Sequence, residues 1–190
     1  DEALFMAHAT LGGVRSNNQT DPAWTMADPL VSEGHVVIDL GDDFFTAGKP
    51  HPMIDPAARA ERIAREGADP GTAVILIDVV LGYGAHPDPA GEAAQAIATA
   101  KARAAAAGRA LPVVTFVCGT EEDPQRLSQQ EAKLRAAGAL VTASNAQATR
   151  VAYFGVQSGL AQVKALEAAE SSARLALEAT QLGYRVGVRV

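Results

Sequence analysis

The stretch AVILIDVVLGYGAHPDPAGEAAQAIATAKARAAAAGRALPVVTFVCG, residues 73–119, carries the pattern that decides the fold. It contains an apolar run, a loop with two glycines, an Asp-Pro pair, an alanine-rich helical stretch, a closing glycine and a second apolar run. Strands that are apolar on both faces and alternate with helices belong to parallel sheets covered on both sides. The stretch therefore predicts a strand–helix–strand unit of a parallel sheet.

The same order recurs on both sides of this unit. HVVIDL (35–40) precedes DPAARAERIAREG (55–67), and the strand ending in PVVTFVCG precedes DPQRLSQQEAKLRAAG (123–138). In each helix we expect an Asp to cap the free N–H groups, a Pro to occupy the first position and a Gly to end the helix in the left-handed conformation. These residues are Asp55, Asp88 and Asp123, then Pro56, Pro89 and Pro124, and finally Gly67, Gly108 and Gly138.

A fourth strand is predicted in ALVTAS (139–144), followed by a short helix that Ser144 or Asn145 caps and that runs through Phe154. Repeated strand–helix units with right-handed crossovers favour neighbouring parallel strands. The sequence therefore predicts a doubly wound, flavodoxin-like α/β domain over residues 1–154. Within it, the strands at 73–81, 112–118 and 139–144 should be neighbours.

The rest of the chain, residues 155–190, is expected to be a separate element. Leu160, Val163, Leu166, Leu175 and Leu177 recur among alanines and charges in a segment that predicts a long helix, and YRVGVRV (184–190) is typical of a strand. Such a helix could cover the sheet or bind a partner, and its role stays unassigned.

Composition excludes several classes of protein. The chain has 190 residues, of which 48% are hydrophobic, so it can bury a sizeable core. Its formal net charge of -6, with 16 scattered Lys and Arg, argues against a nucleic-acid surface. Its apolar runs are shorter than the roughly 20 residues of a membrane helix, and a single cysteine, Cys118, cannot form a disulfide framework. We expect a cytoplasmic protein without nucleic-acid or membrane partners, in which Cys118 is a small buried residue.

Parallel sheets of this kind bind ligands outside the carboxyl ends of their strands. The search for a site therefore narrows to four loops, at 39–54, 78–89, 118–123 and 143–146. The first of them contains GDDFFTAGKPHP, residues 41–52, which concentrates acids, a lysine and a histidine in twelve positions.

Two interpretations of residues 41–52 stay open. In the functional one, Gly41, Asp42, Asp43, Lys49 and His51 bind a ligand or phosphate. The two carboxylates would hold Mg²⁺, and the lysine would neutralise a phosphate or acyl-phosphate charge. In the structural one, the acids cap backbone amides and the histidine stiffens a proline-rich turn.

The loop DVVLGYGAHPDP, residues 78–89, offers two candidate catalytic residues, Asp78 and His86. Gly82 and Gly84 would let the backbone approach a ligand, and the histidine could donate to an anion or exchange a proton near neutral pH. A carboxylate at a strand end could have a perturbed pKa in a cleft. The alternative is a tight turn with an exposed histidine and an acid that caps local amides.

Five segments carry a resemblance to a known family. They resemble the carboxyl-terminal, ligase-like region of the FdrA proteins, which are acyl-CoA synthetase-like and similar to the α subunit of succinyl-CoA synthetase. The resemblance covers residues 1 to about 154. The segments are LGGVRSNNQ (11–19), DLGDDFFTAGKPHPMIDP (39–56), LIDVVLGYGAHPDPA (76–90), FVCGTEEDPQ (116–125) and LRAAGALVTASNAQATRVA (134–152).

The resemblance implies a ligase domain that works beside an amino-terminal CoA-binding domain or a partner subunit, in an oligomer. It implies acyl or carbamoyl transfer through a phosphorylated intermediate, with CoA or carbamoyl phosphate and Mg²⁺ as candidate cofactors. Two alternatives stay open: a carbamoyltransferase subunit of the oxamate type, acting in allantoin and purine breakdown, or a non-catalytic scaffold subunit.

The chain departs from the succinyl-CoA synthetase relatives at one loop. Those relatives carry a phosphorylated histidine in a GHAGA-type loop after the strand that PVVTFVCG resembles, whereas residues 119–138 contain no histidine. A phosphohistidine relay of the usual kind is therefore not supported, although Asp78 matches the acid that helps hold that histidine. The resemblance also places a GGTLC-type turn before the helix at DEALFMAHATLG, so we expect catalysis to need an amino-terminal part or a partner.

Overall fold

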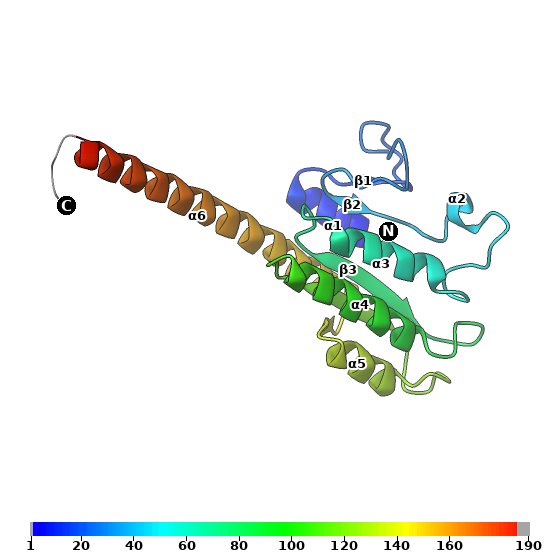
Figure 1. Ribbon diagram of the computed structural model, residues 1–190. Helices are drawn as coiled ribbons and strands as arrows, with labels where there is room; N and C mark the ends of the chain where they lie inside the picture. The colour runs from blue at the N-terminus through cyan, green and yellow to red at the C-terminus, as the bar shows by residue number, and fades with distance from the viewer. Residues whose placement is uncertain (1, 186–190) are drawn as a thin grey trace. The chain divides into compact units, whose positions relative to one another are not determined.

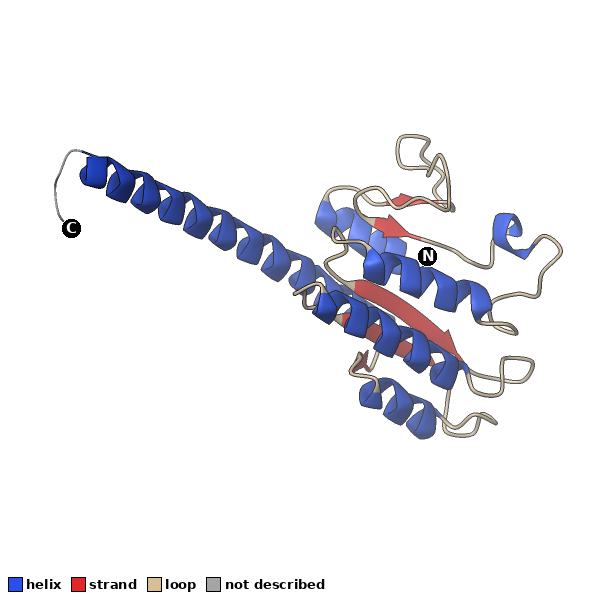
Figure 2. Cartoon of the chain, in the orientation of Figure 1, coloured by secondary structure: helices blue, strands red, loops and turns tan. Residues whose placement is uncertain are grey.

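The computed structural model of the chain describes residues 2–185. Residues up to Gly155 form one compact unit, and a second unit begins at Val156 (Figures 1 and 2). In chain order the elements are α1 (Glu2–Leu11), β1 (Arg15–Ser16), β2 (Val36–Val37), α2 (Asp43–Thr46), α3 (Ala57–Ala68), β3 (Ile75–Val80), α4 (Pro89–Ala106), β4 (Val113–Cys118), α5 (Leu127–Ala136), β5 (Leu140–Thr142) and α6 (Asn145–Arg185).

The main sheet has three parallel strands in the order β3-β4-β5. In its register Asp78 lies beside Phe116, and Phe116 lies beside Thr142. This arrangement confirms that the three apolar runs at 73–81, 112–118 and 139–144 are parallel neighbours, as the doubly wound α/β fold requires.

Helices cover both faces of the main sheet. On one face Val79 and Val113 are fully buried in a core that also contains Ile97 of α4 and Leu134 of α5. On the other face Val114 packs with alanines of α6. Successive strand residues point to opposite faces, so a strand covered on both is apolar at most positions. This explains the long apolar runs of the strand sequences, which are interrupted by one exposed acid in β3 and one buried threonine in β4.

The expected strand at 35–40 is wrong in two respects. Only Val36 and Val37 form a strand, and it pairs in parallel with β1 in a separate two-stranded sheet. The ladder stops because the side chain of Asn17 forms the hydrogen bonds that a neighbouring strand would otherwise form with Asp39. Its Oδ1 accepts from the Asp39 N–H and its Nδ2 donates to the Asp39 carbonyl, both at 2.9 Å.

The predicted Asp-Pro helix start is confirmed in full at α4 and in part at α3. Asp88 caps α4 by accepting from the Gly91 N–H, and Pro89 is the first helical residue. At the start of α3 Asp55 accepts from the Ala57 N–H, but Pro56 is the N-cap residue and not the first helical residue. The third start is wrong, because α5 begins only at Leu127.

Asp123 and Pro124 lie in the loop before α5. The Asp123 carboxylate accepts from the Thr120 N–H and closes a turn instead of capping a helix. Glu121 takes the cap's place, since it accepts from both the backbone N–H and the hydroxyl of Ser128. The backbone enters the helix through Arg126, which has a φ of 58°.

Of the three predicted glycine stops, two are confirmed and one is wrong. Gly108 and Gly138 have φ of 72° and 78°, which is the left-handed conformation that ends a helix. Gly67 instead lies inside α3 and is buried, and a Cβ built there would stand 2.5 Å from the Cβ of Ala100. It allows α3 and α4 to pack closely, and Figure 1 shows these helices side by side.

The helix after β5 does not end at Phe154. Ser144 caps α6 by accepting from the Gln147 N–H, and the helix then continues to Arg185. No proline interrupts this alanine-rich segment, so helix propensity carries it onward. Tyr184 and Arg185, predicted to begin a strand, belong to this helix, and residues 186–190 of that predicted strand lie outside the described residues.

Within residues 2–185, no helix is both long enough and apolar enough to cross a membrane.

The contact between Gly67 and Ala100 gives a test of this packing. In an isolated helix, replacing Gly by Ala stabilises by about 1 kcal/mol, whereas steric overlap in a packed core costs about 1–3 kcal/mol. We therefore expect Gly67→Ala to lower the free energy of unfolding by up to roughly 2 kcal/mol in urea titrations. The matched control is Gly155→Ala in α6, where the added Cβ would meet Val74 at an ordinary 3.7 Å and should stabilise. Equal stabilisation by both variants would contradict the close contact.

Candidate functional site

Three loops are joined at the carboxyl ends of β3 and β4. The backbone N–H of His86 donates to the carbonyl of Met53 at 2.7 Å, which ties the 78–89 loop to the end of the first loop. The side chain of Gln125, only 6% exposed, ties the same loop to the segment after β4. Its Nε2 donates to the carbonyls of Gly82 (2.9 Å) and His86 (3.1 Å), and its Oε1 accepts from the Gly82 N–H (3.1 Å).

A second buried glutamine supports the first. Gln130, 2% exposed, accepts through Oε1 from the Ala90 N–H in the first turn of α4 and donates through Nε2 to the Gln125 carbonyl. Neither glutamine is predicted from the sequence. The available signal is that Gln130 lies four residues before Leu134, on the buried face of α5.

The predicted glycines of the second loop have backbone conformations that favour glycine. Gly82 has a φ of 129° and Gly84 a φ of 83°. The nearest atom to a Cβ built on Gly82 would be an Asp123 carboxylate oxygen at 4.0 Å, so conformation and not space calls for glycine at that position. Between the two glycines Tyr83 is 89% exposed, which leaves the tip of this loop open to solvent.

His86 is held with a defined ring orientation. Its Nδ1 accepts from the Asp88 N–H at 3.1 Å, so the neutral ring carries its proton on Nε2. The ring can then offer one N–H donor to an anion, as the sequence predicts for this residue.

Asp88 caps α4 and also forms an ion pair with Lys133 of α5, at 2.7 Å. Burial alone would raise the pKa of this carboxyl. The hydrogen bonds from Lys133, the Gly91 N–H and Gln130, together with the charge of Lys133, outweigh burial and hold the pKa below its ordinary value. The carboxylate therefore stays ionised and links α4 to α5 at the base of the loop.

Asp78 is exposed and lies near a cation that the sequence does not single out. Arg59, in the first turn of α3, feels the charge of Asp78. Burial lowers the pKa of Arg59, and the attraction of Asp78 opposes that shift. An arginine with a partly desolvated guanidinium is suited to binding carboxylate or phosphate oxygens.

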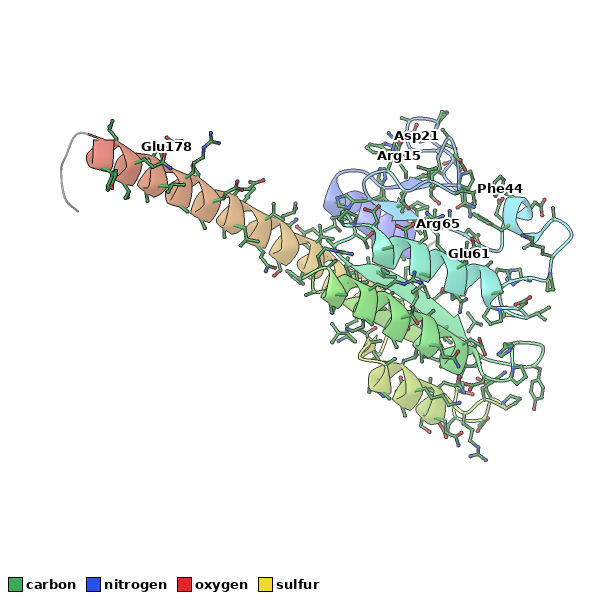
Figure 3. All side chains as sticks on the ribbon, in the orientation of Figure 1. Arg15, Asp21, Phe44, Glu61, Arg65 and Glu178 are labelled. Atoms are coloured by element: carbon green, nitrogen blue, oxygen red, sulfur yellow. The ribbon has the colours of Figure 1, made fainter. Side chains whose placement is uncertain are left out.

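In the first loop the two neighbouring acids, Asp42 and Asp43, have different environments. Asp42 caps the short helix α2 by accepting from the Phe44 N–H at 2.9 Å, whereas Asp43 is the exposed first residue of that helix. Lys49 is also exposed. Figure 3 labels Phe44 on α2, and this residue is 54% exposed. This part of the loop combines a structural cap with exposed charges of both signs.

His51 and Gly41 form a close contact within the first loop. His51 accepts through Nδ1 from the Met53 N–H, and its Nε2 would stand 2.5 Å from a Cβ built on Gly41. The Gly41 N–H donates to the carboxylate of Asp39 at 2.9 Å. Gly41 is therefore glycine because the imidazole ring lies over it, and the contact fixes the ring in the loop.

The structure brings only some of the predicted residues together. Met53 and His86 join the first two loops, but no hydrogen bond or ion pair within residues 2–185 links Asp42, Asp43 or Lys49 to Asp78 or His86. That part of the chain also contains no group of three His, Cys, Asp or Glu residues able to hold a metal ion. A Mg²⁺ ion at Asp42 and Asp43 would need further oxygens from a substrate.

The loop after β4 has acidic character. Cys118 is exposed, which corrects its expected burial, because it ends the strand at the rim of the sheet. In the same loop, hydrogen bonds from the backbone N–H and the hydroxyl of Ser128 lower the pKa of Glu121.

A shallow cavity of about 300 Å³ lies away from these loops, near the amino end of β4. It is lined by Lys101, Arg109, Leu111 and Pro112 among others.

Parallel strands with helices on both faces define a doubly wound α/β domain, and the joined strand-end loops form its candidate binding edge. Residues 6–154 match the CoA-ligase family, and the chain belongs to this family. Membership supports an acyl-CoA synthetase-like function at the level of the family. The chain is also similar to the uncharacterized protein YahF of Escherichia coli (strain K12), with 46% identity over 145 residues. The match covers 76% of this chain and 28% of the relative, so the chain spans well under half of YahF.

The bonds of Gln125 predict a measurable loosening of the site. Gln125→Ala removes the partners of the Gly82 and His86 backbone groups, and a buried group left without a partner costs about 1–3 kcal/mol. We expect a loss of unfolding free energy in that range and faster hydrogen exchange at the Gly82 amide. Gln129→Ala, at an exposed position of α5, is the control and should change neither. Unchanged hydrogen exchange at the Gly82 amide in Gln125→Ala would show that the 78–89 loop is ordered without the bonds of Gln125.

The depressed pKa of Asp88 predicts acid sensitivity. A carboxyl whose pKa is lower in the folded protein stabilises fully above its unfolded pKa, and this contribution disappears as pH falls through the folded value. We expect the free energy of unfolding to fall below about pH 4, and to fall less steeply in Asp88→Asn. Urea titrations from pH 7 to 3 measure this, with Glu92→Gln on the exposed side of the same helix as control. The same slope in all three proteins would refute the assignment.

Proposed function

We propose that this chain is the ligase-like domain of an FdrA-type protein and takes part in acyl or carbamoyl transfer through a phosphorylated intermediate. The junction of three loops at the carboxyl ends of β3 and β4, through Gln125 and the His86 N–H, is the observation that carries this proposal. Ligands of open parallel sheets bind at this edge. Membership of the CoA-ligase family supports the acyl-CoA synthetase-like class.

The proposed roles follow from exposure and charge. Lys49, exposed in the first loop, would neutralise a phosphate or acyl-phosphate group, and the Nε2–H of His86 would donate to it. The open backbone at Gly82 and Gly84 would approach the ligand closely. Asp78 would act with Arg59 nearby, holding or exchanging a proton at the reacting group.

The intermediate we propose is a bound acyl or carbamoyl phosphate. Residues 119–126 contain no histidine to carry a phosphoryl group, and both Glu121 and Asp123 are occupied with the turn that leads into α5. Asp42 and Asp43 would place Mg²⁺ on the phosphate, with substrate oxygens completing its coordination. Residues 1–154 would form the ligase domain, and an amino-terminal CoA-binding domain or partner subunit in the cytoplasm would supply CoA.

A carbamoyltransferase subunit of the oxamate type is the narrower form of the same proposal and differs only in the acceptor. A non-catalytic scaffold is the second candidate. The scaffold is favoured by one observation, the engagement of Asp42, Glu121 and Asp123 in caps and turns. Ligand binding and turnover separate the two candidates, because a scaffold need show neither.

Binding is tested with the full-length protein. A ligand that binds only the folded state at one hundred times its dissociation constant stabilises by about 2.7 kcal/mol. We expect carbamoyl phosphate or CoA to raise the melting temperature by several degrees, and nucleotides with Mg²⁺ serve as the third ligand in the set. No shift with any of the three would remove the support for a transfer site.

Lys49 provides the sharpest test of turnover. Removing one positive charge that faces the transferred group should lower the transfer rate of the full-length protein about a hundredfold or more. Lys49→Ala is compared with Lys164→Ala, which removes the same charge from an exposed position of α6. Wild-type turnover in Lys49→Ala would favour the purely structural interpretation of residues 41–52.

A further inference from the structure

The second unit presents a regular stripe of mainly apolar residues. Seven residues of α6 recur at spacings of three and four and are called the α6 stripe here: Val163, Leu166, Glu170, Ala173, Leu177, Thr180 and Tyr184. Its large members are well exposed, at 52% for Val163, 63% for Leu166 and 58% for Leu177. Alternating spacings of three and four define the seam along which two helices pack. Among the described residues of the second unit, 156–185, no other element covers this seam.

Charges beside the stripe favour one occupant and one orientation. Glu167 and Arg174 lie on the same flank of the α6 stripe, one heptad apart. In an antiparallel pair of identical helices centred between residues 171 and 172, Glu167 of each copy lies beside Arg174 of the other. In a parallel pair the same glutamate would face the uncharged Gln162. Charge complementarity therefore points to a second copy of this chain, in the antiparallel orientation.

We propose that residues 156–185 of α6 pair antiparallel with the same segment of a second copy of the chain. In this register Leu166 packs against Leu177 of the second copy, and two-fold symmetry repeats the contact. Ala173 lies near the centre, where a small residue lets the two backbones approach. Each copy contributes the same surface, so the contact closes on itself as a dimer.

Two features of the helix moderate the strength of this pair. Arg174 already bonds Glu178 of its own chain at 3.3 Å in an exposed ion pair, and Figure 3 labels Glu178 on this helix. Such exposed pairs contribute little, so Arg174 can share its charge with a second carboxylate. The two copies of Glu170 lie near each other across the two-fold axis and repel, which makes the dimer reversible.

Sedimentation equilibrium of the 190-residue chain tests the association. Leu177→Glu disrupts both leucine contacts and should raise the dimer dissociation constant at least a hundredfold, whereas Glu170→Leu should lower it at least tenfold. Leu175→Glu is the matched control, since Leu175 is 64% exposed and lies off the stripe. Circular dichroism should show that each variant stays helical. A wild-type monomer at all concentrations, or equal weakening by the two Leu→Glu variants, would overturn the proposal.

Disulfide formation tests the orientation. In a Cys118→Ser background, Leu166→Cys and Leu177→Cys chains are mixed and oxidised with glutathione disulfide. Antiparallel pairing predicts the mixed disulfide between positions 166 and 177 as the main product. Predominant 166–166 and 177–177 disulfides would show a parallel pair and overturn the proposed register. Leu166→Cys mixed with Leu175→Cys is the control and should cross-link poorly.

Discussion

The parallel pairing of β3 with β4 is the constraint on which the rest of this domain depends. The two strands pair over their whole length, from Ile75 beside Val113 to Val80 beside Cys118. Both strands end at the same level, so the chain leaves the sheet at two adjacent points. The loops that follow β3 and β4 therefore lie at the same edge of the sheet. Val79 and Val113 in these strands are fully buried, and a slip by one residue would turn them to the opposite face of the sheet.

The edge itself is built from polar contacts that burial makes strong. Gln125 and Gln130 satisfy backbone groups that would otherwise be left without partners away from water. Hydrogen bonds in such surroundings are expensive to lose and specific in geometry. The loops are thus ordered by side chains that come from the neighbouring segment.

The fold could be predicted from the sequence wherever the local conformational preference of a segment agrees with its packing in the domain. Three apolar runs and the Asp88-Pro89 helix start predict the parallel sheet, because burial on both faces demands such runs. The strand at 35–40 was not predictable in its extent, since Asn17, far away in sequence, ends its ladder. The rule that ligands bind at strand ends selected the loops of the candidate site. It could not reveal Gln125 or Arg59, whose roles arise only when other elements pack beside them.

The hydrogen bond between the His86 N–H and the Met53 carbonyl has a consequence for which substitutions these two loops can tolerate. It joins the loops through main-chain atoms alone, so it does not depend on which side chain stands at either position. A substitution that keeps the backbone conformation can therefore alter the chemistry of one loop while its connection to the other persists. A change that moves the backbone, such as an insertion beside either position, would break that connection.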